Sequence, residues 1–338
     1  MVVQTKSAVT RVRPAMVWPR LALPLWVTFT LKKVFHLTGV LLGVTFLVSV
    51  MLSFLPGDAA RAILGDTASD EQVAVVRADL GLDKSVLARY WDWLAAALHG
   101  DLGTSYRTGE PVWDALMERL PVSIELMVLV QVFALGVAIV LALWVTYRPD
   151  GWLDKITSLW AFGGISIPHF VLALGLIYFF SVSLGWLPAS GFVPFAESPS
   201  ENLKYMALPA LALAMEPAAV YLRLLRNDLR TSLGEEYVLA VQAKGMSSFN
   251  ILVRQMLRPS SFSMVTLAGI NTARLIGSAV VIETIFALPG LGRLLVDSVT
   301  ARDFVMIQAL VAVIAVIYVV VNALIDLIYL FLDPRVRA

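Results

Sequence analysis

Residues 235–258 read EEYVLAVQAKGMSSFNILVRQMLR and form the centre of a basic, moderately apolar island that extends over 223–258. Long hydrophobic stretches flank this island on both sides. The island therefore interrupts a chain that is otherwise suited to hydrocarbon. It predicts a docking surface for a soluble partner on one side of a membrane.

The overall composition predicts a membrane protein. Of 338 residues, 59% are hydrophobic and 15% are charged, and a soluble domain of this length needs more polar surface. The net charge of +1 creates no field that would favour nucleic acid. The chain has no cysteine and its three histidines are scattered, so the sequence predicts neither a disulfide nor a metal site.

Six segments are long and apolar enough to cross a bilayer. A helix rises about 1.5 Å per residue, so about 20 apolar residues cross a hydrocarbon core about 30 Å thick. The fourth segment is the weakest candidate for a membrane span, and Pro209 and Pro217 are expected to kink it. The predicted spans are 34–55, 122–146, 156–184, 203–222, 262–288 and 304–332.

Lysine and arginine indicate that both termini lie on the cytoplasmic side. With the N-terminus inside, the inner segments carry sixteen basic residues and the two short outer loops carry three. Basic residues concentrate in cytoplasmic loops, whereas a long loop such as the one after the first span crosses regardless of its charge. Residues 1–32 then form a cytoplasmic or interfacial segment, or a disordered tail, ahead of a transmembrane domain at 33–338.

The loop at 57–120 is too polar for a membrane and predicts a small extracytoplasmic helical insertion. It holds eleven acidic residues and six basic ones. Ser69 and Gln72 have the spacing of a capping box, and the helix that follows is expected to stop at Gly81. A second helix is expected at about 84–98, and a third begins at Pro111. The acidity favours a cationic ligand or a basic partner, but a solvated surface is the simpler interpretation.

Gly245 interrupts a helical pattern within the island. Glycine adopts a positive φ readily, so two short helices can meet there at a sharp angle, with Ser247 capping the second. Such a bend would present a compact knob that carries force between a soluble motor and the membrane helices. An ordinary helix–turn–helix linker explains the same pattern, and the shape alone does not separate the two interpretations.

Two longer motifs and several short ones give the chain a family resemblance. Residues 236–245, EYVLAVQAKG, look like the cytoplasmic coupling motif, or EAA loop, of ABC importer permeases. Residues 280–293, VVIETIFALPGLGR, are similar to the most specific signature of the dipeptide/oligopeptide/nickel branch, through Glu283, Pro289, Gly290 and Gly292. The supporting stretches are LPGD at 55–58, GEPV at 109–112, RLP at 119–121, IP at 167–168, GWLPA at 185–189 and DPRVR at 333–337.

The resemblance, which covers nearly all of the chain after about residue 33, implies an assembly. Two permease subunits form a heterodimer, two ATPase subunits bind ATP and Mg²⁺ and grip the coupling helices, and an extracytoplasmic substrate-binding protein delivers the solute. Carried onto this sequence, the coupling positions are Glu236, Ala240, Ala243 and Gly245. The glutamate of the general motif would fall at Leu239, and the acidic residue here comes earlier, at Glu236.

Two charged residues inside the predicted spans are candidates for the translocation path, because charge within a bilayer is costly. Arg274 lies near the middle of the fifth span, and Glu216 lies in the fourth. We expect Arg274 to face the path or the partner permease, where it attracts a substrate carboxylate or pairs with a glutamate. The alternative is a structural ion pair of Arg274 with Glu216 or with a partner residue. His169, in the third span, is interpreted as a packing residue.

These patterns together predict an all-α polytopic protein of the bacterial inner membrane, with six transmembrane helices of the type I ABC importer permease fold. No G-x-x-x-x-G-K-[ST] run occurs, so the chain is expected to bind no cofactor itself and to be no enzyme. Its predicted function is ATP-driven translocation of short peptides by alternating access. Nickel chelate and glutathione are alternative substrates, while a secondary transporter, a membrane-embedded enzyme and a sensor subunit are alternative classes.

Overall fold

The computed structural model describes residues 25–54, 61, 68–79, 81, 83–164 and 166–332. The motifs at 55–58 and 333–337, and most of the N-terminal segment, lie outside the described residues. Contacts divide the chain into a unit that ends at Val40 and a unit that begins at Leu41.

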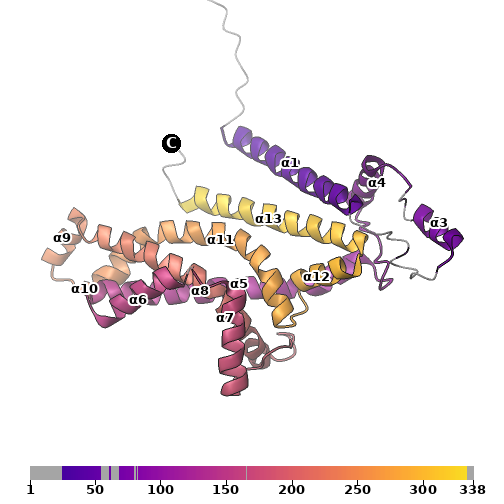
Figure 1. Ribbon diagram of the computed structural model, residues 1–338. Helices are drawn as coiled ribbons and strands as arrows, with labels where there is room; N and C mark the ends of the chain where they lie inside the picture. Colours follow the sequence, from indigo (N-terminus) through magenta and orange to yellow (C-terminus); the bar gives the residue numbers. More distant parts are fainter. Residues whose placement is uncertain are drawn as a thin grey trace, which may run out of the picture. The chain divides into compact units, whose positions relative to one another are not determined.

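The described residues form helices and no strand, apart from one isolated bridge between Thr104 and Pro111. This confirms the all-α class. Figure 1 labels the elements. The α-helices are α1 (Leu25–Ser53), α3 (Asp70–Asp79), α4 (Val86–Leu98), α5 (Val112–Tyr147), α6 (Trp152–Gly163), α7 (His169–Leu176), α8 (Pro199–Ser232), α9 (Glu236–Ala243), α10 (Ser248–Asn250), α11 (Leu257–Ile285), α12 (Leu291–Ala301) and α13 (Phe304–Leu332), and two π-helical segments are η1 (Ile177–Ser183) and η2 (Ile251–Met256).

Four of the described helical segments are long and apolar enough to cross a membrane: α5, α8, the run Ser248–Ile285 that ends with α11, and α13. They fall at the second, fourth, fifth and sixth predicted spans. Shorter apolar helices, Leu37–Ser53 and His169–Ser183, fall at the first and third. The fifth helix ends at Ile285 rather than at 288, because the chain turns there toward α12.

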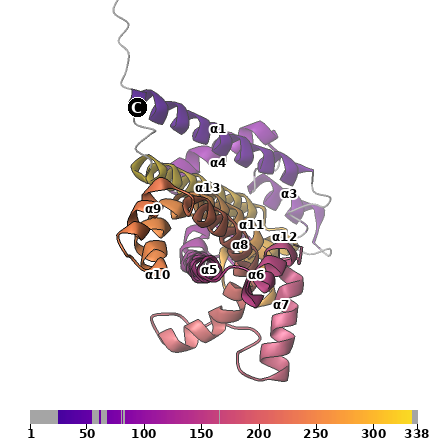
Figure 2. The same cartoon turned by 90° about the vertical axis from the view of Figure 1, so that its left-hand side faces the viewer.

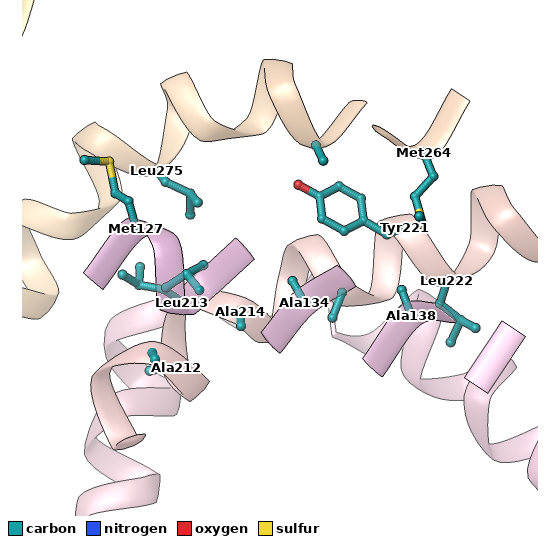
Figure 3. Packing of buried hydrophobic residues seen from close by; sticks show 14 of the residues in the cluster. Met127, Ala134, Ala138, Ala212, Leu213, Ala214, Tyr221, Leu222, Met264 and Leu275 are labelled. Atoms are coloured by element: carbon teal, nitrogen blue, oxygen red, sulfur yellow. The ribbon is translucent and has the colours of Figure 1, made fainter. Parts of the chain in front are cut away.

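Helix α8 is the central helix of this bundle. Its apolar window is 67% buried, against 28–33% for the other three long helices. It packs against α5 and α11, which lie beside it in Figure 1 and Figure 2. Small side chains make this close packing possible: Ala134 and Ala138 of α5 and Ala214 of α8 are fully buried in the shared core, as Figure 3 shows.

The third predicted span is wrong as a single helix. Helix α6 ends at Gly163, and a new helix, α7, begins at His169 after Pro168. Proline has no backbone N–H and disfavours helical geometry in the residue before it, so the apolar run breaks at this point.

The third helix predicted for the outer insertion is also wrong as a separate element. Pro111 does occupy the N-cap position, but the helix it starts is α5, which continues for 36 residues. Pro121 lies inside α5, and Pro209 and Pro217 lie inside α8. Proline is tolerated inside a membrane helix when neighbouring groups satisfy the backbone carbonyl that it frees.

The helix α3, which begins at Asp70, follows the predicted capping chemistry. The backbone N–H of Gln72 donates to Ser69 Oγ at 3.3 Å, and the backbone N–H of Ser69 donates to Gln72 Oε1 at 3.1 Å. This reciprocal pair is the predicted capping box. The second helix, α4, is capped by Ser85, whose hydroxyl accepts the Ala88 N–H at 3.3 Å.

Candidate functional site

The bend predicted in the island is present. Helix α9 ends in a turn closed by the Gly245 N–H, which donates to the Gln242 carbonyl at 2.9 Å. Gly245 has a φ of +83°, in the left-handed region that other residues rarely adopt. Ser247 takes the N-cap position of α10, although its side chain makes no capping hydrogen bond.

The bend is fixed to the membrane bundle by a short apolar base. Val238 from α9 and Ile251, Leu252 and Met256 from η2 are at most 3% exposed and belong to the same buried cluster as the long helices. Displacement of the bend therefore has to displace side chains that pack against α8 and α11. This arrangement is mechanically continuous from the bend to the spans.

The predicted coupling residues all lie on the exposed side of this base. Glu236, Ala240, Ala243 and Gly245 are exposed. Leu239, beside them, is 58% exposed although it is large and apolar. A small, partly apolar surface with a rigid foundation is therefore available for a protein partner.

A buried carboxylate clamps the same end of the bundle. Asp154 of α6 is only 6% exposed and forms ion pairs with Arg226 and Arg230 of α8. The Arg226 guanidinium also donates to Ser158 Oγ at 2.7 Å. The clamp holds α6 against the extension of α8 that leads into α9. Nothing in the sequence signalled that these residues meet.

In the segment that resembles the family signature, a side chain of α11 caps the N-terminus of α12. Glu283 of α11 is 1% exposed, and its carboxylate accepts hydrogen bonds from the Gly292 N–H at 2.7 Å and the Arg293 N–H at 3.2 Å. Ser123 of α5 donates to Glu283 at 2.7 Å and accepts the Leu291 N–H at 2.9 Å. The first three free N–H groups of α12 are thereby satisfied, and α5, α11 and α12 are joined at one point.

The glycines of the signature have a steric reason. A Cβ at Gly290 would overlap the Glu283 carboxyl group, and a Cβ at Gly292 would lie 2.5 Å from the Val280 Cα. Pro289, in contrast, is exposed. The close approach of α12 to α11 thus requires glycine at two of the signature positions.

The two candidate path residues do not pair with each other among the described ion pairs. Glu216 instead lies 3.0 Å from His169 Nε2, where α7 begins after its break. Arg274 is exposed on α11, and the described part of the chain shows no ion pair for it. The alternative that joined Arg274 to Glu216 therefore needs correction, because the break at Pro168 brings a histidine to the glutamate.

A polar junction in the middle of the bundle was missed by the sequence interpretation. The Gln131 side-chain amide of α5 donates to Thr272 Oγ1 at 2.8 Å and to the Ala268 carbonyl at 3.0 Å, both on α11. The Tyr221 hydroxyl of α8 donates to Gln131 Oε1 at 3.2 Å. Figure 3 shows Tyr221 within the buried cluster. A lone glutamine in an apolar run was the available signal.

Comparison with known proteins identifies the class that this architecture serves. The family described as "Binding-protein-dependent transport system inner membrane component" matches residues 134–338. A second family, which describes the N-terminal part of such membrane components, matches residues 26–127. The chain belongs to this family of transport permeases. It is therefore a multi-pass membrane protein.

Several curated relatives match nearly the whole chain. A Brucella abortus (strain 2308) protein whose name describes a peptide transport system permease is 38% identical over 91% of this chain and 98% of its own. The glutathione transport system permease protein of Escherichia coli O6:H1 is 34% identical over 91% and 98%. The dipeptide transport system permease protein of Alkalihalophilus pseudofirmus is 30% identical over 91% and 99%.

A chain from a crystal structure of an amino acid ABC transporter with histidines has a TM-score of 0.49 and 16% sequence identity. The match covers 64% of this chain and 92% of that chain.

Proposed function

We propose that this chain is the membrane-spanning subunit of an ATP-driven, binding-protein-dependent importer of short peptides. The names of the relatives in Brucella and Alkalihalophilus support the peptide substrate. Glutathione, itself a tripeptide, is the second candidate because of the Escherichia coli relative. The chain catalyses no covalent step, and ATP and Mg²⁺ are bound by partner ATPase subunits.

The proposed assembly has a defined orientation. This chain pairs with a second permease as a heterodimer, two ATPases bind from the cytoplasm, and a substrate-binding protein docks outside. Both termini and the island at 223–258 face the cytoplasm, as the distribution of basic residues favours. Residues 57–120 lie on the opposite side.

The observation that carries the proposal is the bend at Gly245. It combines an exposed surface at Glu236, Ala240 and Ala243 with a buried base at Val238 that packs into the spans. A partner that changes conformation on ATP hydrolysis can bind the exposed surface and shift the helices through the base. Differential binding of the two permease conformations then produces alternating access.

The charged residues Glu216 and Arg274 support a translocation path along α7, α8 and α11. Glu216 is half-exposed beside His169, and Arg274 is exposed on α11 away from both helix ends. A short peptide carries both an ammonium and a carboxylate group. Glu216 is suited to the first and Arg274 to the second, since charge retained inside a membrane helix bundle commonly marks a substrate pathway.

The coupling role is tested by Gly245→Val, assayed in the complete complex reconstituted in liposomes. Space for a Cβ is open at this position, so the strain comes from the positive φ and not from a clash. A strain of about 1–2 kcal/mol disfavours the bent conformation roughly 5- to 30-fold. We expect peptide uptake per ATP hydrolysed to fall by a comparable factor.

Gly136→Ala is the matched control. Gly136 lies inside α5, has no positive φ and leaves a Cβ free of contacts. Alanine there is expected to leave uptake unchanged. Wild-type uptake by the Gly245→Val complex would remove the coupling assignment.

Arg274→Gln tests the path. Reduced uptake in a complex that still assembles supports contact with the substrate. Loss of assembly would support contact with the second permease instead. Normal assembly together with normal uptake would end the proposed role of Arg274.

A further inference from the structure

Helix α4 of the outer insertion has an apolar stripe that the described part of the chain leaves uncovered. Leu87, Trp91 and Leu98 are 56%, 57% and 80% exposed. Their spacing of four and seven residues places them on one face of the helix. Three large apolar side chains on one exposed face are unusual for a helix surrounded by water.

The neighbouring face of α4 packs on the end of α1 that precedes the outer loop. The Tyr90 hydroxyl lies 3.0 Å from Thr45 Oγ1 and donates to the Leu42 carbonyl at 3.1 Å. The Tyr90 ring meets Phe46 edge-on at 5.2 Å. Tyr90 is 4% exposed, so this contact is a packed one.

The contacts of α4 extend along the last part of α1, from the Leu42 carbonyl to the Ser53 hydroxyl. Leu42 precedes the last residue of α1, Ser53, by eleven positions, which correspond to about 16 Å along the axis. Half of a hydrocarbon core is about 15 Å thick. Beside the contact, Leu47 and Met51 of α1 are 56% and 58% exposed, as expected for side chains that meet lipid. The apolar surface of α1 therefore continues onto α4.

The charges of α4 lie on the remaining arc, away from the stripe. Asp92 forms an ion pair with Lys84 at 2.7 Å, and both side chains are more than half exposed. The Arg89 guanidinium reaches toward the end of α1 and donates to Ser53 Oγ at 2.6 Å. A helix with one arc against a span, one apolar arc and one charged arc is suited to the boundary between lipid and water.

We propose that α4 is immersed in the bilayer, with Leu87, Trp91 and Leu98 in contact with the lipid of the leaflet where α1 ends. In the proposed topology this is the outer leaflet. The insertion would then be anchored to the membrane beside α1 instead of standing free in the outer aqueous space. The inference depends on α1 being a membrane helix and not on the transported substrate or on coupling to ATP.

Spin labels at single cysteines test this placement, because the chain has no cysteine of its own. Leu87→Cys and Leu98→Cys place a label on the stripe, and Ala88→Cys places one on the exposed charged arc as the control. All three side chains point away from the packed core, so the labelled chains are expected to fold. Each variant is purified with cysteine-free partner subunits and reconstituted in phosphatidylethanolamine–phosphatidylglycerol vesicles.

The readout is collision of the label with oxygen, which concentrates in lipid, and with a nickel chelate, which remains in water. We expect oxygen accessibility to exceed nickel accessibility several-fold at 87 and 98, with the order reversed at 88. High nickel accessibility at all three positions would place α4 in water and overturn the proposal. Labels at 87 and 98 shielded from both reagents would mean that another protein covers the stripe, which also overturns it.

Discussion

Removal of the Glu283 carboxylate is expected to destabilise the bundle by uncapping α12. The carboxylate is 1% exposed and accepts the N–H groups of Gly292 and Arg293. In Glu283→Ala both donors lose their acceptor, and each buried unsatisfied donor costs about 1–3 kcal/mol. The expected loss in the free energy of unfolding is therefore about 2–6 kcal/mol, with a further contribution from the cavity.

Glu283→Gln gives a graded comparison. The glutamine oxygen can still accept both N–H groups, and its amide can donate to Ser123 once that hydroxyl rotates. What is lost is the charge assistance, which about doubles the strength of such hydrogen bonds. The expected loss is about 1–2 kcal/mol, between that of Glu283→Ala and the wild type.

Unfolding in mixed micelles titrated with sodium dodecyl sulfate, followed by tryptophan fluorescence, measures these differences. The control is Glu201→Gln, which removes the exposed partner of Lys204 at the start of α8. Exposed pairs of this kind contribute at most about 1 kcal/mol. Equal losses for Glu283→Ala and Glu201→Gln would refute the cap as a stabilising element.

Two further predictions concern the two ends of the bundle. Asp154→Asn weakens the ion pairs to Arg226 and Arg230 and is expected to lower the free energy of unfolding by about 1–3 kcal/mol, whereas Asp150→Asn, at an exposed position with φ +62°, is expected to be neutral. Partial burial, and to a smaller extent the Asp303 carboxylate, raises the pKa of Tyr106. The neutral phenol therefore stabilises the folded chain below the ordinary tyrosine pKa near 10, and this stabilisation is lost as the pH rises through the pKa in the folded state. Tyr106→Phe is expected to flatten that alkaline loss in the same titration, and an unchanged pH profile would contradict the assignment.

The hydrophobic pattern was sufficient to predict the fold class and the positions of the apolar helices. Length and hydropathy identify a span because the bilayer imposes both. They do not reveal a break when an apolar run continues across it. The run at 156–184 stays apolar through Pro168, yet α6 ends at Gly163 and α7 begins only at His169. Pro121, Pro209 and Pro217 lie inside continuous helices, so proline alone does not decide the outcome.

For the candidate residues too, the sequence predicted local conformation but not contacts between helices. The positive φ of Gly245 followed from local chemistry, because glycine relieves a steric restriction within its own residue. The partner of Glu216 did not follow, because helix rotation and register decide whether His169 or Arg274 reaches it. The signature around Glu283 was recognised by resemblance, but its capping role depends on a helix that begins eight residues later.

Uptake of a labelled dipeptide into proteoliposomes measures whether this chain transports only when partner subunits hydrolyse ATP. The vesicles contain this chain with its second permease, both ATPases and the binding protein, and uptake is measured with ATP and with a non-hydrolysable analogue. We expect uptake only with ATP, and a roughly 5- to 30-fold fall in uptake per ATP hydrolysed in Gly245→Val although the ATPases remain bound. Sustained uptake by this chain alone, without any ATPase, would contradict it.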